Sequence, residues 1–195
     1  MDARRPQLII LAGPNGAGKS TSAPDLLRDA FAVDEFVNAD AIALGLSAFS
    51  PDGVALEAGK IMLRRLRELA EKRVDFAFET TLASRSFAPR LRQLRDEGYA
   101  AHLFFLSLPN ADFAVERVRA RVLLGGHSVD DTIIRRRFDA GLRNFFQLYM
   151  PVLSSWIFYD NSLPGLPTAI ARGDEGGMEI FDHTRFREFE KRAER

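Results

Sequence analysis

The chain has 195 residues, of which 46% are hydrophobic and 16 are phenylalanine. This is enough for one well-buried α/β core, so we expect a single domain over residues 1–195. Lysine plus arginine and aspartate plus glutamate both number 27, and the formal net charge is therefore zero. A balanced charge argues against nucleic acid or an anionic membrane as partner and favours a small-molecule substrate. The sequence has no cysteine, which excludes disulfides, thiolate metal sites and a cysteine nucleophile.

Residues 1–12 superficially resemble a secretory signal peptide, because two arginines precede a short apolar run. The run is too short for an export signal and leads straight into a glycine-rich segment. No other apolar stretch approaches the roughly 20 residues that a membrane-spanning helix needs. We therefore expect a soluble, cytoplasmic protein.

A phosphate-binding loop follows the first predicted strand, residues 7–12. Residues 13–21 read Gly-Pro-Asn-Gly-Ala-Gly-Lys-Ser-Thr, a complete G-x-x-x-x-G-K-[ST] motif behind the strand that the motif requires. The glycines let successive backbone N–H groups point at a phosphate. Lys19 would reach the β- and γ-phosphate oxygens, and the Ser20 hydroxyl would ligate Mg²⁺. The predicted nucleotide-binding residues are Gly13, Pro14, Asn15, Gly16, Ala17, Gly18, Lys19, Ser20 and Thr21.

Strands and helices alternate along the chain up to residue 159. The hydrophobic spacing predicts helices at residues 19–30, 54–69, 87–97, 110–124 and 130–149, and further strands at residues 35–40, 74–79, 101–107 and 156–159. This order predicts an α/β fold with a doubly wound, mainly parallel, five-stranded sheet, helices on both faces and right-handed crossovers. Residues 168–181 predict a small β-hairpin at the sheet edge, followed by a charged helix that starts near Thr184.

Polar side chains end three of the predicted strands, where ligands bind in a doubly wound sheet. Asp40 ends the second strand and is our candidate for the general base that takes a proton from an acceptor hydroxyl. The competing interpretation is that Asp40 caps the helix that follows. Glu79 ends the third strand and, with Thr81, is a candidate for binding the acceptor; the alternative is a turn or cap. Residues 160–162, Asp-Asn-Ser, end the fifth strand.

An arginine-rich segment, residues 117–137, predicts a lid. Arg117 and Arg121 are four residues apart and share a helix face, from which they could neutralise charge on a transferring phosphoryl group. They precede the glycine pair at 125–126, which would let the segment close. His127, Arg135 and Arg137 are weaker candidates for contact with the phosphates. We interpret Arg136, opposite an apolar stripe, as part of a solvated helix face.

Seven segments of the chain, taken together and in order, resemble the zeta-toxin family of P-loop kinases. They are the phosphate loop at 13–21, Val-Asn-Ala-Asp-Ala-Ile at 37–42, Leu-Glu-Ala-Gly at 56–59, Phe-Ala-Phe-Glu-Thr-Thr-Leu at 76–82, Arg-Val at 121–122 with Gly-Gly-His-Ser-Val at 125–129, Ile-Arg-Arg-Arg-Phe at 134–138 and Tyr-Asp-Asn-Ser at 159–162. The sequence is most similar to the free-standing bacterial branch of that family.

The resemblance implies an ATP-dependent kinase with a P-loop kinase fold. Lys19 would bind the β/γ-phosphates and Asp40 would be the general base, while Glu79 and Thr81 would contact the acceptor. In characterised zeta toxins the acceptor is the 3′-hydroxyl of the sugar in UDP-N-acetylglucosamine. The first phosphate-binding arginine of the family matches Arg117 best, whereas the second falls near His127. An antitoxin-like inhibitor protein is the macromolecular partner that the resemblance implies.

Three other functions stay open. An ABC-type or mechanical ATPase would share the wording of the phosphate loop, but it would need an apolar strand ending in Asp-Glu after the signature-like residues 124–127, where this chain has an arginine-rich helix. A non-catalytic nucleotide-binding module would tolerate loss of the Asp40 carboxylate. A kinase of another small metabolite or antibiotic hydroxyl would share every site residue.

Overall fold

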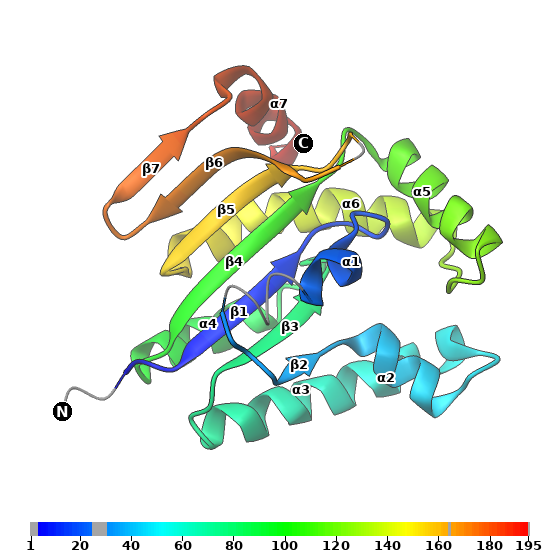
Figure 1. Cartoon of the computed structure of the whole chain (residues 1–195), viewed down its shortest axis with the longest axis horizontal. Helices are drawn as coiled ribbons and strands as arrows, with labels where there is room; N and C mark the ends of the chain where they lie inside the picture. The colour runs from blue at the N-terminus through cyan, green and yellow to red at the C-terminus, as the bar shows by residue number, and fades with distance from the viewer. Residues whose placement is uncertain (1–3, 25–30, 164, 195) are drawn as a thin grey trace.

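The computed structural model describes residues 4–24, 31–163 and 165–194. Its strands form one sheet in the order β2-β3-β1-β4-β5-β6-β7 (Figure 1). Five strands are parallel: β1 (Gln7–Ala12), β2 (Phe36–Val37), β3 (Phe76–Thr80), β4 (Ala100–Ser107) and β5 (Ser155–Asp160). The hairpin β6 (Thr168–Asp174) and β7 (Gly177–Ile180) adds an antiparallel edge. The predicted mainly parallel α/β sheet is confirmed, and the expected hairpin extends the same sheet from five strands to seven.

The helices follow the predicted order, with small differences at their ends. They are α1 (Lys19–Pro24), α2 (Ala39–Leu46), the 3₁₀ turn η2 (Pro51–Val54), α3 (Ala55–Glu71), α4 (Phe87–Asp96), α5 (Ala111–Leu123), α6 (Asp131–Asn144), the π-helical turn η3 (Phe145–Tyr149), the 3₁₀ turn η4 (Met150–Val152) and α7 (His183–Ala193). The helix predicted over residues 130–149 is thus α-helical only to Asn144. The predicted continuation of the first helix, residues 25–30, lies outside the described residues.

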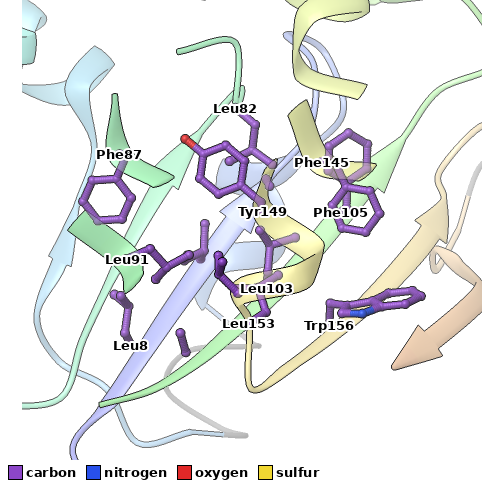
Figure 2. Packing of buried hydrophobic residues seen from close by; sticks show 14 of the residues in the cluster. Leu8, Leu82, Phe87, Leu91, Leu103, Phe105, Phe145, Tyr149, Leu153 and Trp156 are labelled. Atoms are coloured by element: carbon purple, nitrogen blue, oxygen red, sulfur yellow. The ribbon is translucent and has the colours of Figure 1, made fainter. Parts of the chain in front are cut away.

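Alternating strand residues build a core on each face of the sheet, as expected for parallel strands with helices on both sides. On one face, Leu8, Phe76 and Phe105 pack with side chains of α3, α4, α6, η3 and α7 (Figure 2). On the other face, Ile9 and Leu11 pack with Ala23 of α1. The two cores hold the central strands rigidly, so that the loops at their carboxyl ends start from fixed positions.

The second strand differs from its prediction. Residues 35–40 were expected to be extended, but β2 covers only Phe36–Val37, and Asn38 caps α2 by accepting hydrogen bonds from the N–H groups of Asp40 and Ala41. Asn is among the best capping residues, and a helix start competes locally with a strand. Asp40 therefore lies in the first turn of α2, and the residue that caps this helix is Asn38.

Candidate active site at the carboxyl ends of the strands

The phosphate-binding loop lies between β1 and α1 (Figure 1). Its glycines Gly13, Gly16 and Gly18 have φ angles of +137°, +79° and +83°, a region that side-chain-bearing residues rarely adopt. A Cβ at Gly13 would stand 2.2 Å from the backbone oxygen of Leu106 in β4. The loop therefore needs glycine both for its conformation and for its close approach to the neighbouring strand.

Lys19 is folded into the loop, and only 6% of the residue is exposed. Its Nζ donates a hydrogen bond to the backbone oxygen of Pro14 at 3.0 Å and lies 3.6 Å from Oε1 of Glu79. Burial lowers the pKa of the Lys19 ammonium from its ordinary value, and the carboxylates of Glu79 and Asp40 offset this only in part. A buried cation with so few anionic partners has capacity for further negative charge.

Glu79 is the centre of a small polar network near the end of β3. Its Oε2 accepts hydrogen bonds from the Ser20 hydroxyl at 2.7 Å and from Nδ2 of Asn38 at 3.0 Å. Through Asn38 the network connects the end of β3 with the helix that carries Asp40. The capping residue thus ties α2 to Glu79, a link that the sequence analysis missed.

Two adjoining cavities share Asn15, Lys19, Asp40 and Glu79. The smaller cavity, of about 300 Å³, is bordered by the phosphate loop and α5, and its lining includes Gly16, Gly18, Ser20, Thr21, Arg117, Ala120 and Arg121. The larger, of about 470 Å³, lies on the other side of the shared residues. Lys19, Asp40 and Glu79 therefore stand where the two spaces meet.

The larger cavity is walled by the loop after β3 and by α6. Its remaining lining residues are Ala39, Met62, Thr80, Thr81, Ala83, Ser84, Arg136, Arg137 and Ala140. Thr81, predicted near Glu79, does lie on this wall. Arg136, which we interpreted as part of a solvated face, is exposed, and it also borders this cavity beside Arg137. Arginine is long enough to reach a cavity rim from a helix position that an apolar pattern leaves outside.

The predicted lid arginines lie in different places, and Arg137 borders the larger cavity. Arg117 and Arg121 both border the smaller cavity. Arg117 stacks over the Phe113 ring and donates to the backbone oxygen of Ser162 at 3.4 Å. Arg121 donates to the backbone oxygen of His127 at 2.7 Å. Arg135, by contrast, forms an ion pair with Asp112 and borders neither of the two cavities.

The polar end of β5 supports the phosphate loop. Nδ2 of Asn161 donates to the backbone oxygen of Ala17 at 2.8 Å. Asp160 pairs with Arg185 of α7 at 2.7 Å and also accepts from Ser162. Burial alone would raise the pKa of Asp160, but the hydrogen bonds from Ser162 and Arg185 outweigh it and hold this pKa below 3.8. Residues 160–162 thus have a visible structural task, which their strand-end position alone did not reveal.

Two buried atoms at the cavities lack a partner. Oδ1 of Asn15 and Nε of Arg121 form no hydrogen bond with any of the residues that the structure describes. Buried polar groups in proteins are nearly always satisfied, so unpaired atoms beside a cavity favour a polar ligand there. In the described ranges no three His, Cys, Asp or Glu side chains group together as a metal site. A Mg²⁺ ion fits Ser20 and Glu79 only together with phosphate oxygens and water, which is how this ion usually binds.

The sequence model of the zeta toxin family, described as "Zeta toxin", matches residues 51–150, just over half of the chain. The chain belongs to the zeta toxin family. The matched segment includes Glu79, Thr81 and the lid arginines, whereas the phosphate loop and Asp40 precede it. This membership and the strand order together confirm the resemblance predicted from the sequence.

Individual relatives of this zeta toxin family member are distant. An uncharacterized protein of Haemophilus influenzae is 27% identical over 132 residues, which cover 67% of this chain and 91% of the relative. A crystal structure of the AvrRxo1-ORF1:-ORF2 complex with ATP matches with a TM-score of 0.74 at 16% identity, over 96% of this chain and 64% of the other. The chain thus spans less than two thirds of that relative's length.

A structure from the PezAT toxin–antitoxin system of Streptococcus pneumoniae matches this zeta toxin family chain with a TM-score of 0.64 at 14% identity. The match covers 100% of this chain and 88% of the other. Likenesses at this identity concern the fold alone. None of the helices in the described part of the chain is long and apolar enough to cross a membrane.

Proposed function

We propose that the protein is an ATP-dependent kinase that transfers the γ-phosphoryl group to a hydroxyl of a small molecule, with a nucleotide sugar such as UDP-N-acetylglucosamine as the acceptor. The observation that carries this proposal is the pair of cavities that meet at Lys19, Asp40 and Glu79. A phosphoryl donor in the smaller cavity and an acceptor in the larger one would face each other across these residues.

The donor side of the proposal rests on the phosphate loop. Backbone N–H groups of residues 15–18 and the Lys19 ammonium would bind the β- and γ-phosphates, and the Ser20 hydroxyl would hold Mg²⁺. When bound, the ion neutralises charge on the phosphates. Arg117 and Arg121, which border the same cavity, stabilise charge on the transferring group.

The acceptor side of the proposal assigns the base to Asp40. Its carboxylate takes the proton of the acceptor hydroxyl as that oxygen bonds to the γ-phosphorus, while the bond from the γ-phosphorus to the bridging oxygen of ADP breaks. Glu79 and Thr81 bind and orient the hydroxyl-bearing part of the acceptor. Arg136 and Arg137 on the cavity wall suit an acceptor that carries phosphate groups of its own, as a nucleotide sugar does.

The proposal also covers the organisation and the surroundings of the enzyme. We infer that residues 1–195 act as one kinase domain whose lid, residues 117–137, closes over the donor. A cytoplasmic protein without nucleic-acid or membrane partners fits the balanced charge. The relative from the PezAT toxin–antitoxin system supports an antitoxin-like inhibitor protein as a partner; such an inhibitor would slow phosphoryl transfer when added to the purified kinase.

The proposal is tested by incubating the protein with ATP, Mg²⁺ and a panel of nucleotide sugars, nucleosides and hydroxyl-bearing antibiotics, followed by mass spectrometry. The expected result is one added phosphate on UDP-N-acetylglucosamine. A phosphate on a different member of the panel would support the kinase activity but show that the acceptor is another molecule. ATP hydrolysis with no phosphorylated acceptor would favour the ATPase alternative and contradict the proposal.

A further inference from the structure

The loop after β3, residues 80–84, forms one wall of the larger cavity through Thr80, Thr81, Ala83 and Ser84. It has an unusual backbone. Leu82 has a φ of +56° although it is not glycine, and its side chain is fully buried in the core shared with Tyr149 (Figure 2). A side-chain-bearing residue in this region costs conformational free energy and persists only where the surroundings hold it. Something must therefore fix this loop.

Helix α6 and the π-turn after it supply the fixing contacts. Nδ2 of Asn144 donates to the backbone oxygens of Leu82 at 2.7 Å and Ala83 at 3.2 Å. The Tyr149 hydroxyl donates to the backbone oxygen of Ser84 at 2.8 Å. Asn144 and Tyr149 are both buried; the bond to Leu82 is buried as well, whereas the bonds to Ala83 and Ser84 are partly buried.

A third contact comes from Gly141, where a Cβ would stand 2.2 Å from the backbone oxygen of Thr81. Helix and loop touch directly at this point. The backbone oxygens of residues 82–84 thus accept hydrogen bonds from Asn144 and Tyr149, and the Thr81 oxygen packs closely against Gly141. We call Gly141, Asn144 and Tyr149 the α6 anchor.

The same helix carries Arg136, Arg137 and Ala140, which form the facing wall of the cavity. The α6 anchor therefore joins both walls into one unit. The π-turn that contains Tyr149 is itself a rare structure that proteins often use near functional sites.

We propose that Asn144 and Tyr149 are positioning residues for the acceptor: they set the distance between the two cavity walls without touching the acceptor themselves. This inference rests on the proposed kinase function for its kinetic consequence, and on the structure alone for its effect on the loop. The phosphate loop shares none of these contacts, so loss of the anchor would weaken acceptor binding and leave ATP binding unchanged.

The kinetic test compares Asn144→Ala and Tyr149→Phe with Tyr99→Phe, using UDP-N-acetylglucosamine and ATP as substrates. Tyr99 is a matched control, because it is equally buried and its hydroxyl donates to the backbone oxygen of Val74 at 3.0 Å, outside the cavity lining. We expect the acceptor KM to rise roughly tenfold or more in Asn144→Ala and about threefold in Tyr149→Phe. The KM for ATP should stay within about twofold, and Tyr99→Phe should change neither KM.

The second readout does not depend on the substrate. Hydrogen exchange of the backbone amides in residues 80–84 should be faster in Asn144→Ala and Tyr149→Phe than in the wild type and in Tyr99→Phe. If Asn144→Ala does not fold, the exchange rates and KM values of the milder variant Tyr149→Phe decide whether the inference holds. Equal effects on both KM values, or an unchanged exchange rate, would overturn the inference. If the wild type phosphorylates no UDP-N-acetylglucosamine, the proposed acceptor fails and the exchange measurement alone decides on the anchor.

Discussion

Gly13 illustrates how much a single residue contributes to the site. Its φ of +137° and its approach to the Leu106 oxygen mean that any side chain would displace either the loop or β4. Lys19 depends on the same loop, because its Nζ is bonded to the Pro14 oxygen. The geometry of the phosphate loop therefore depends on Gly13, the first residue after β1.

Replacing Gly13 with alanine should lower the free energy of unfolding by at least about 2 kcal/mol, because the backbone is strained and the new Cβ overlaps a strand oxygen. The control is Gly45→Ala in α2, where a Cβ would meet nothing within 4 Å. That change should instead raise stability by up to about 1 kcal/mol, the difference in helix propensity. Urea unfolding of both variants measures the effect. Equal stability of the two variants would contradict this interpretation of Gly13.

At the scale of elements, α7 fastens the end of β5. Arg185 bonds Asp160 through both Nε and Nη2, at 3.2 and 2.7 Å, and the adjacent Asn161 supports the phosphate loop at Ala17. Helix α7 is thus linked to the phosphate loop through the adjacent residues Asp160 and Asn161. The pKa of Asp160, held below 3.8, makes this link dependent on pH.

A carboxylate whose pKa is lowered in the folded state stabilises the fold above its ordinary pKa, and this contribution is lost as the pH falls through the lowered value. Asp160→Asn should therefore be less stable than the wild type at pH 7, and the difference should shrink below about pH 4. Urea unfolding over a pH series checks this, with the exposed Asp139→Asn as control. A difference that stays constant with pH would show that the Asp160 charge is not involved.

The order and kind of the elements could be predicted from the sequence, because the apolar strands and the amphipathic helices have strong periodicity. The end of the second strand could not, since Asn38 caps a helix at a position where the pattern alone favours extension. The contribution of Arg136 to the cavity and the support from Asn161 were also missed, because both depend on contacts between segments far apart in the chain. The positions of Thr81 and Lys19 at the cavities could be predicted, because strand ends and the phosphate loop fix them locally.

At the scale of the whole molecule, the two cavities lie at the carboxyl edge of a parallel sheet whose strands are buried on both faces. A ligand that binds this folded edge and not the unfolded chain must stabilise the entire fold. The stability of the protein therefore reports on occupancy of the site.

ATP with Mg²⁺ at about 100 times its dissociation constant should raise the melting temperature of the wild type by roughly 5 to 10 °C, since such an excess contributes about 2.7 kcal/mol. Lys19→Ala should show no such rise, because the cation that meets the phosphates is gone. Lys72→Ala, at the end of α3, should behave as the wild type does. A similar rise in Lys19→Ala would show that ATP binds elsewhere.

The rate of phosphate transfer from ATP to UDP-N-acetylglucosamine, measured in the wild type and in Asp40→Asn, decides whether Asp40 takes the proton of an acceptor hydroxyl beside a bound triphosphate. The rate should be lower in Asp40→Asn by about 10²-fold or more, with ATP affinity unchanged, because only proton transfer is removed. An undiminished rate in Asp40→Asn would contradict it.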